Sequence, residues 1–502
     1  MSAPAIHPDP YRWKALIFIA LAQLMVALDS TIVNIALPTA QADLNISDGN
    51  RQWAITAYAL AFGSLLLLGG RICDLWGRKP TFILGLTGFA AASVLGGAAT
   101  NETMLLISRA LQGAFGALLA PAALSLLAVM FTDTVERAKA FGIFSAIAGG
   151  GSALGLILGG LLTEYLNWRW TFYINIPFAV AAVIGALTVI REPAHSRNTA
   201  RLDIPGVVLA TLGLIALVYG FTRAETDGWA AASTLILLTA AVILLGSFAL
   251  VESRVKDPLL PLRVVTERTR AGAFLGMALA VIGMFGLFLF LTYYLQVVRG
   301  YSPVTTGLAF LPLVVGTIAG STQIGPRLTT RIGPRLLMAS GLLTAVLGML
   351  LLTRIDVDTS YPALILPSFF ILGLGLGIAF LVGMTLATHG IRPQDAGIAS
   401  AMANASQQIG GALGTALLNT IAASATTAYL TTRTTETPVP QAVQQQAMVH
   451  GYTTAIWWAV AILTLSALIA LILIRTRHRP GTHPTPNPDT TADTPHTAAP
   501  TH

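Results

Sequence analysis

Long apolar segments separated by short polar ones run through most of this chain. Each segment has about eighteen residues or more, enough to cross a bilayer core of roughly 30 Å as a helix. Helices are predicted because a chain in lipid must satisfy its backbone hydrogen bonds internally, and the alternation of a membrane barrel is absent. Fourteen spans are predicted, at residues 13–37, 53–70, 80–99, 104–128, 139–164, 170–190, 204–222, 230–251, 271–295, 304–324, 336–353, 361–387, 396–421 and 450–474.

The composition supports the same class of protein. The 502 residues are 54% hydrophobic and only 10% charged, whereas soluble domains carry about 25% charged residues. The chain is therefore predicted to be an integral membrane protein. The first apolar segment is followed by AQA (Ala40–Ala42), which resembles a signal-peptide cleavage site. That segment is too long for a signal peptide and contains Asp29 and Asn34, so we expect it to be retained as a span.

The positions of Lys and Arg predict the orientation of the spans. With the N-terminus inside, most of the 29 basic residues fall in inner loops and termini. The outer loops hold Arg51, Arg169, Arg223, Arg299, Arg354 and Arg433. The positive-inside rule then predicts a multi-pass protein of the cell membrane with both termini cytoplasmic. The net charge of +7 is thereby a topology signal, and no nucleic-acid partner is expected.

Weak internal repeats predict how the spans are grouped. GIFSA (Gly142–Ala146) recurs as GIASA (Gly397–Ala401), and DLWGR (Asp74–Arg78) has an echo in TRIGP (Thr330–Pro334). These offsets skip eight helices, as expected for two six-helix halves with an extra pair between them. Repeated halves with a site between them are common in secondary transporters.

The predicted fold is therefore an all-α integral membrane protein with fourteen transmembrane helices. The predicted parts are an N-terminal six-helix bundle at 1–190, a two-helix central insertion at 204–252, a C-terminal six-helix bundle at 253–475 and a disordered cytoplasmic tail at 476–502. The tail is rich in Pro and Thr, and its histidines are not read as metal ligands. The single cysteine, Cys73, permits no internal disulfide.

One predicted span contains an isolated carboxylate. Within QLMVALDSTIVNIALP (Gln23–Pro38), Asp29 is far from the nearest charges, Lys14 and Asp43. The polar residues that share one side of the helical wheel, with Asp29 at their flank, are Gln23, Ser30, Thr31 and Asn34. Such a stripe must face a cavity or other helices. Burying an ionisable group costs about 2.5–3.5 kcal/mol or more, which favours a functional role over a structural hydrogen-bonding patch.

Arg109, in LISRALQGAFG, is the other charge predicted deep within a span. At 1.5 Å per residue, Asp29 lies about 12 Å below Leu37 and Arg109 about 9 Å below Thr103, both at outer helix ends. The matching depths predict that the two side chains lie close together. A nearby cation favours the ionised carboxylate and desolvation favours the neutral acid, so moving Arg109 would switch the proton on or off. A static pair that only orients two helices is the alternative.

Small residues mark two helix faces where close packing is expected. Gln112, Gly113 and Gly116 share the face of Arg109. On another span, Gly151, Gly155 and Gly159 recur every four residues, which lets two helix backbones touch. GGGSALG has no preceding strand, so it is not read as a dinucleotide loop.

Motifs for ATP use and hydrolysis are absent from the sequence. The lysines are Lys14, Lys79, Lys139 and Lys256, and none follows a glycine, which excludes a GK[ST] phosphate loop. No HExxH or GxSxG motif occurs either. We therefore expect no enzyme activity, no cofactor and no metal, and an energy source in an ion gradient or a partner.

Six motifs together resemble those of the fourteen-helix drug:proton antiporter branch of the major facilitator superfamily, over about residues 13–475. They are LDSTIVNIALP, GRICDLWGRK (Gly70–Lys79), RALQG (Arg109–Gly113), GLILGG (Gly155–Gly160), WRWTFYINIP (Trp168–Pro177) and YLQVVRGYSP (Tyr294–Pro303). The resemblance implies that Asp29 and Arg109 take part in proton coupling. It also implies an inner gate of Gly70, Asp74, Gly77 and Arg78, and helix packing at Gly151, Gly155, Gly159 and Gly160. Plain positive-inside charge is the alternative for Arg78 and Lys79.

The chain departs from that branch in two respects. The usual proline after the glycine of the fifth helix is Leu156 here, and the acidic residues that some relatives carry in helices 2, 10 or 13 are missing. The span at 396–421 offers Asn404, Gln407 and Gln408 instead, so a substrate need not be a multivalent cation. The candidate cavity residues are Gln23, Asn34, Gln112, Tyr293, Tyr294, Gln296, Asn404 and Gln408.

The predicted function is proton-driven efflux, by drug:H+ antiport, of a hydrophobic small molecule such as an antibiotic, dye or toxic metabolite. Its partners are that substrate, protons and the lipid bilayer, and the chain is expected to act as a monomer. Export of an endogenous metabolite, siderophore or lipid is the alternative within transport. A non-transporting scaffold or receptor is disfavoured because the loops are too short for an ordered soluble domain.

Overall fold

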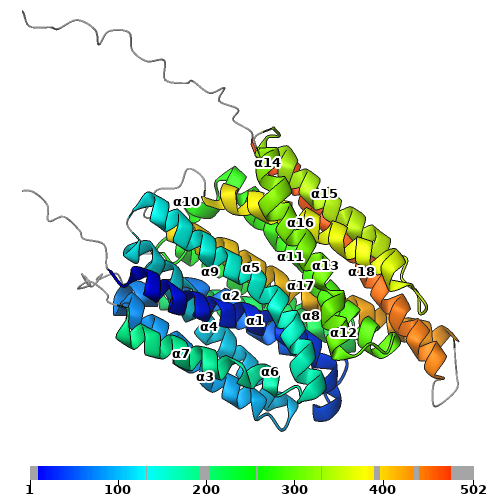
Figure 1. Ribbon diagram of the computed structural model, residues 1–502. Helices are drawn as coiled ribbons and strands as arrows, with labels where there is room; N and C mark the ends of the chain where they lie inside the picture. The colour runs from blue at the N-terminus through cyan, green and yellow to red at the C-terminus, as the bar shows by residue number, and fades with distance from the viewer. Residues whose placement is uncertain are drawn as a thin grey trace, which may run out of the picture.

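Every regular element that the structure describes is a helix (Figure 1). The structure is a computed structural model, and it describes residues 10–131, 133–190, 203–255, 258–329, 331–388, 396–433 and 440–475. No strand occurs within these ranges, which confirms the all-helical prediction. The predicted disordered tail at 476–502 lies outside them.

The N-terminal helices, α1 to α7, cover the first six predicted spans. They are α1 (Arg12–Leu44), α2 (Trp53–Trp76), α3 (Arg78–Gly97), α4 (Glu102–Met130), α5 (Thr134–Tyr165), α6 (Trp170–Tyr173) and α7 (Asn175–Thr188). A single residue, Gly77, separates α2 from α3. Its φ of +100° lies in a region that a residue with a Cβ rarely adopts, so this turn favours glycine.

A hairpin of two helices follows, α8 (Ile204–Asp227) and α9 (Ala232–Glu252). The two helices pack on each other, and α8 also packs on α2 and α17 (Ala396–Arg433). One apolar cluster joins Leu214 and Val218 of α8 to Ala59 of α2 and Ala412 of α17. The hairpin therefore lies where an N-terminal helix meets a C-terminal one.

The C-terminal helices, α10 to α18, are interrupted by three π-helical turns, η1 to η3. Besides α17 they are α10 (Leu262–Val265), α11 (Arg268–Tyr293), η1 (Tyr294–Val298), α12 (Pro303–Ala309), α13 (Leu311–Ile318), η2 (Ala319–Ile324), α14 (Gly325–Thr329), α15 (Pro334–Leu352), η3 (Tyr361–Ile365), α16 (Leu366–Thr388) and α18 (Gln441–Leu473). The span predicted as one helix at 304–324 is therefore broken near Phe310 and changes to π-helical turns from Ala319.

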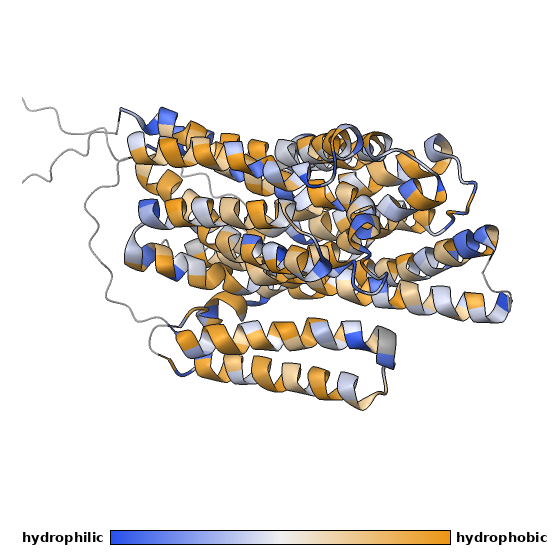
Figure 2. Cartoon of the chain, turned by 90° about the horizontal axis from the view of Figure 1, so that it is seen from below, coloured by the Kyte–Doolittle hydropathy of each residue, from blue (hydrophilic) through white to orange (hydrophobic). Residues whose placement is uncertain are grey.

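Thirteen helical segments in the described ranges are long and apolar enough to cross a membrane. Each of the fourteen predicted spans falls on a helix, and the exact number of crossings stays a prediction. Several predicted ends are wrong: α1 continues past Pro38 to Leu44, and α17 reaches Arg433 rather than residue 421. Hydropathy marks only the apolar part of a helix, so a polar continuation is missed. Figure 2 shows hydrophobic colouring along the helices and hydrophilic colouring mainly at their ends and in loops.

The helices run between two ends of the molecule. Helix α1 begins and α18 ends at the same end (Figure 1). We call this end the terminus side and the opposite end the far side. The N-terminal and C-terminal helices meet chiefly where α2 packs on α17 and where α5 packs on α12.

Candidate functional site

The carboxylate of Asp29 lies completely buried in the middle of α1 and accepts three hydrogen bonds. Arg109 Nη1 lies 2.7 Å from Oδ2, while Gln112 Nε2 and Asn175 Nδ2 lie 2.9 Å and 2.8 Å from Oδ1. A buried charge is tolerated when it is both paired and hydrogen-bonded, and Asp29 meets both conditions. The proximity of Asp29 and Arg109 that their depths predicted is confirmed.

The guanidinium of Arg109 is held on several sides. Its Nε donates to the backbone carbonyl of Ala54 on α2 at 2.8 Å, and Nη1 also donates to Oε1 of Gln112 at 2.7 Å. Cζ of Arg109 lies over the ring of Tyr58, 4.4 Å from the ring centroid. Because arginine stays charged at any ordinary pH, this arrangement fixes a permanent cation beside Asp29.

Sequence reasoning missed Asn175 and Ser93, which complete this cluster. Asn175 is the first residue of α7, and its side chain donates to Asp29. Ser93 Oγ on α3 lies 2.9 Å from Gln112 Nε2 and 3.3 Å from Asn175 Nδ2. Asn175 stands in the quoted motif WRWTFYINIP, so that motif could have identified it. Ser93 had no sequence signal, because a lone serine in an apolar span is common.

A cavity of about 330 Å³ lies beside the cluster, between N-terminal and C-terminal helices. Its N-terminal wall includes Ser30, Thr31 and Asn34 of α1, three of the four residues of the polar stripe that the helical wheel predicted to face a cavity or other helices. Arg109 and Tyr58 line it as well. The remaining lining residues are Val33, Ile55, Ala59, Ser152, Val281, Met284, Phe285, Phe288, Leu313, Val314, Thr317, Ile318, Phe380, Gln407 and Gln408. Pockets for small molecules in proteins are mostly apolar with a few polar groups, as here.

Of the eight candidate cavity residues, only Asn34 and Gln408 line this cavity. The other six do not, and Gln112 is instead buried in the Asp29 cluster. Tyr293 and Gln296 bond to α1 on the far side: the Tyr293 hydroxyl meets Gln41, and Gln296 Nε2 lies 3.0 Å from the carbonyl of Ile35. The difference in position has a physical reason, because the sequence gives a residue's depth but not the helix that covers it.

Tyr294, Gln23 and Asn404 are the other candidates outside the cavity. The Tyr294 hydroxyl donates to the carbonyl of Asp356 at 2.6 Å, within the C-terminal helices. Asn404 Nδ2 donates to the carbonyl of Ser400 on its own helix at 3.1 Å. Gln23 is half-buried on α1 and is not part of the lining.

Several contacts on the far side join the N-terminal helices to the C-terminal ones. Oε2 of Glu164 on α5 accepts a hydrogen bond from the backbone N–H of Val304 on α12 at 3.0 Å. A Cβ added to Gly160 would lie 2.6 Å from the Cα of Val304. A Cβ added to Gly307 would collide with the carbonyl of Leu156. Leu156, which replaces the family proline, is completely buried at this contact within a continuous helix.

Three further glycines of α5, Gly151, Gly155 and Gly159, pack on α1, the helix that carries Asp29. A Cβ added to Gly151 would lie 2.8 Å from Cβ of Ala27, and one at Gly159 would lie 2.9 Å from the carbonyl of Ile32. A Cβ at Gly155 would collide with Oγ1 of Thr31. This face of α5 therefore lets the two helix backbones approach closely, as the spacing predicted.

The residues predicted to form an inner gate lie at the terminus-side ends of α2 and α3. Arg78 Nε donates to Ser125 Oγ on α4 at 2.6 Å, and Asp74 is exposed on the last turn of α2. Gly77 forms the turn described above. Gly70 has room for a Cβ, which would stand 4.0 Å from Pro121, whereas a Cβ at Gly69 would collide with the carbonyl of Ala117. The gate role of these residues stays a prediction.

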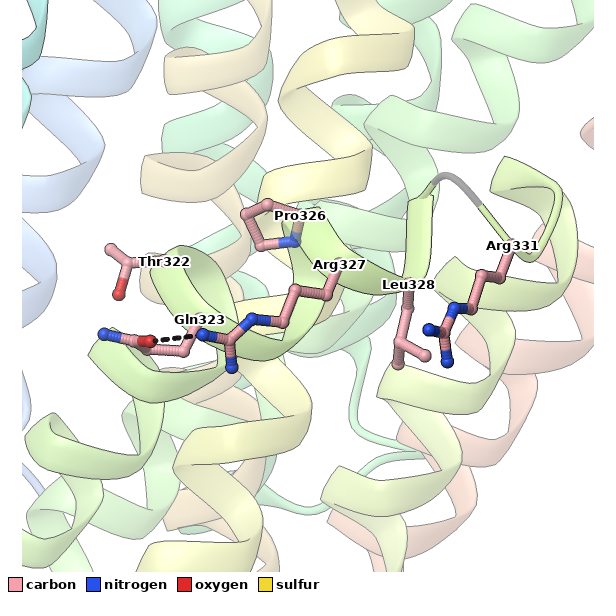
Figure 3. Close-up of a pocket in the computed structure, with 6 residues that line it drawn as sticks. All are labelled: Thr322, Gln323, Pro326, Arg327, Leu328 and Arg331. Carbon is pink, nitrogen blue, oxygen red and sulfur yellow. Dashed lines mark hydrogen bonds between the residues drawn. The ribbon is translucent and has the colours of Figure 1, made fainter.

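A second hollow, of about 520 Å³, lies at the terminus-side end of α14. Figure 3 shows Arg327 extending toward Gln323, with Arg331 beside Leu328. The distance from Arg327 Nη2 to Gln323 Oε1 is 3.4 Å. No carboxylate is among its lining residues, and it shares none with the central cavity.

Comparison with known proteins shows to which family the chain is similar. A family model described as Major Facilitator Superfamily matches residues 19–415. The puromycin resistance protein of Streptomyces alboniger is 51% identical over 478 residues, which are 95% of this chain and 94% of that protein. The cephamycin export protein of Amycolatopsis lactamdurans is 36% identical over 417 residues, covering 82% of this chain and 85% of the relative. The tetracenomycin C resistance and export protein of Streptomyces glaucescens is 35% identical over 414 residues, covering 82% of this chain and 76% of the relative.

Solved structures show the same fold at low sequence identity. A bacterial homolog to the human lysosomal transporter Spinster, in an inward-facing and occupied conformation, has a TM-score of 0.67 at 16% identity, covering 93% of this chain and 97% of that one. An auto-inhibited POT family peptide transporter has a TM-score of 0.65 at 17% identity, covering 94% of this chain and 99% of that one.

These relatives fit the drug:proton antiporter branch that the motifs resemble, and they mark the chain as a multi-pass membrane transporter rather than an enzyme. Because the family model spans most of its length and a relative is half identical over nearly all of it, the chain belongs to the Major Facilitator Superfamily.

Proposed function

We propose that this chain exports a hydrophobic small molecule, such as an antibiotic, dye or toxic metabolite, across the plasma membrane in exchange for protons. One observation carries the proposal: the guanidinium of Arg109 bonds the buried carboxylate of Asp29 and also lines the central cavity. A change of charge on Asp29 therefore acts on a group that faces the substrate space.

The proposed architecture has fourteen crossings. Two six-helix bundles, at 1–190 and 253–475, flank the central insertion at 204–252. The terminus side faces the cytoplasm, because the positive-inside rule assigns the basic loops to that side. One chain holds both the Asp29 cluster and the cavity, which supports a monomer as the working unit.

The far-side contacts support an inward-facing state for this arrangement. Substrate enters the cavity from the cytoplasm while Asp29 is ionised and bonded to Arg109. In the outward-facing state the Asp29 cluster meets outside water and takes up a proton. A neutral Asp29 no longer attracts Arg109 by charge, so Arg109 turns toward the cavity, where its cation disfavours a hydrophobic or weakly basic ligand. Release of substrate outside and of the proton inside completes the cycle.

The proton gradient is a sufficient energy source for this exchange. One charge crossing a membrane potential of ~150 mV releases ~3.5 kcal/mol. At about 1.4 kcal/mol per tenfold, this energy sustains a substrate gradient of a few hundred. No ATP hydrolysis is required.

The lining of the cavity supports a neutral or weakly basic substrate. Phe285, Phe288 and Phe380 provide flat apolar walls, Asn34 and Gln408 provide amides, and no carboxylate is among the lining residues. The name of the half-identical relative supports an antibiotic as substrate. The names of the cephamycin and tetracenomycin C exporters also support an antibiotic-like substrate. Export of an endogenous metabolite, siderophore or lipid is the second candidate.

The test is drug accumulation in a susceptible bacterial host that expresses this chain. The panel contains puromycin, tetracenomycin C and hydrophobic dyes. We expect at least one compound to accumulate less, and a protonophore to restore its accumulation while ATP is kept high. Asp29→Asn should abolish this effect. Asp358→Asn is its matched control, because the side chain of Asp358 is fully exposed. An effect that followed ATP and ignored the proton gradient would contradict the proposal.

A further inference from the structure

A second pair of buried carboxyl groups lies at the terminus-side end of the central hairpin. Asp203 precedes α8 and Glu252 is the last residue of α9, and they are 5% and 3% exposed. Oδ1 of Asp203 accepts a hydrogen bond from the backbone N–H of Gly206, and Oε2 of Glu252 accepts one from that of Leu260, both at 3.0 Å. Each carboxyl group therefore has one oxygen satisfied by a backbone donor.

The other two oxygens face the same point. Oδ2 of Asp203 and Oε1 of Glu252 are buried and have no donor among the described residues. A Cβ added to Gly206 would collide with Oδ2 of Asp203 and would lie 2.9 Å from Oε1 of Glu252. Two ionised carboxylates offer each other no donor and repel, and burial increases the cost. A proton placed between the two oxygens would satisfy both at once.

We propose that Asp203 and Glu252 form a second proton-binding site, in which Glu252 carries a proton and donates it to Oδ2 of Asp203. The helix ends assign the proton. Asp203 caps the N-terminus of α8, where the helix dipole favours an anion, whereas Glu252 ends α9, where the dipole disfavours one.

The site connects the hairpin to the loop region of the predicted inner gate. Arg71 on α2 donates to the carbonyl of Pro258 at 2.6 Å, and the Leu260 N–H two residues later bonds Glu252. Asp203 and Arg71 are charged side chains that act on Glu252. One arginine and one shared negative charge leave this buried corner neutral. Loss of the proton adds a second negative charge and loosens the contact between α8, α9 and α2.

Infrared spectroscopy of the purified full-length chain in lipid nanodiscs tests this site. A protonated carboxyl group gives a carbonyl band that an ionised one lacks. The variant Asp29→Asn serves as the background, so that the proposed export site contributes no band and the two proposals fail separately. At neutral pH we expect an acid band that disappears on raising the pH and is absent after a further Glu252→Gln.

Glu267→Gln is the matched control. Glu267 also lies at a helix end. Partial burial raises the pKa of its carboxyl, but hydrogen bonds from the backbone N–H groups of Arg270 and Thr269 outweigh it and hold that pKa below the usual value. The control should therefore leave the acid band unchanged. A band that Glu252→Gln does not remove, or no band at all, overturns the proposal. A metal cation bound between two ionised carboxylates would give no acid band at all.

A measurement on the unsubstituted chain guards against a folding defect in the variant. A hydrophobic carbodiimide reacts with protonated carboxyl groups in apolar surroundings, and mass spectrometry locates the product. We expect Glu252 to be modified at neutral pH, with modification lost as the pH rises, and Glu267 to stay unmodified. Absence of modification at Glu252 throughout the pH range would contradict a proton on this residue.

Discussion

The Asp29 cluster and the Asp203–Glu252 pair are both buried carboxyl sites, but their surroundings differ. Asp29 accepts from one guanidinium and two side-chain amides. Asp203 and Glu252 each accept from one backbone N–H and otherwise face another acid. Burial is nearly equal, so the donors decide the charge state: three donors favour an ionised Asp29, and a facing acid favours a shared proton.

The two surroundings determine what each site can do when a proton moves. At Asp29 the gain of a proton cancels the charge that attracts Arg109, a residue that lines the cavity. At the hairpin the loss of a proton creates repulsion between two helix ends. The first event is local to the substrate space and the second is local to the terminus side, so substitutions should separate them.

The largest effect is expected from Asp29→Asn. The amide keeps an oxygen for Gln112 or Asn175 but no longer changes charge with pH, so proton-coupled export should fall to the background. Arg109 keeps its bonds to Ala54 and Gln112, so abundance should change little. Accumulation assays and immunoblots measure the two quantities. Active, protonophore-sensitive export by a well-expressed variant would exclude the coupling role.

Arg109→Gln should make the first site resemble the second. Breaking a buried ion pair by removing one partner costs about 3–5 kcal/mol, part of which Asp29 recovers by taking up a proton. We expect export to be nearly lost and a new acid band to appear in the infrared spectrum of the Arg109→Gln, Glu252→Gln double variant. Glu252→Gln alone is the reference spectrum. Without a new band, the idea that Arg109 keeps Asp29 ionised would be wrong.

A smaller effect is expected from Asn175→Ala. Removing one of its three donors weakens the hold on the Asp29 carboxylate and on its pairing with Arg109. Proton-coupled export should therefore fall several-fold while abundance changes little. Transport into inverted vesicles and immunoblots measure the two quantities, and Asn167→Ala, in the loop after α5, is the control. Unchanged export would leave Asn175 with a purely structural role.

Sequence reasoning predicted the helices and the main pair because both leave strong signals. Apolar length marks each span, and two isolated charges at equal depth mark Asp29 and Arg109. It failed where the outcome depends on which helices become neighbours. Tyr293 and Gln296 bond to α1 on the far side, away from the cavity. Asp203 and Glu252 stand 49 positions apart at the ends of the hairpin, and only its folding brings their oxygens together.

The smallest effect on export is expected from the packing of α1, which fixes the position of Asp29. Gly155→Ala would place a Cβ against Thr31 Oγ1 and 2.9 Å from the carbonyl of Leu28, next to Asp29. Overpacking of this kind costs about 1–3 kcal/mol, and a displaced α1 lengthens the bonds of the cluster. Gly150→Ala is the matched control on the same helix, because a Cβ there meets nothing within 4 Å. The melting temperature in detergent should fall for Gly155→Ala and stay the same or rise for Gly150→Ala. Only Gly155→Ala should show a modest loss of export. Equal stability of the two variants would mean that the α1–α5 contact is looser than described, and that the donors alone position Asp29.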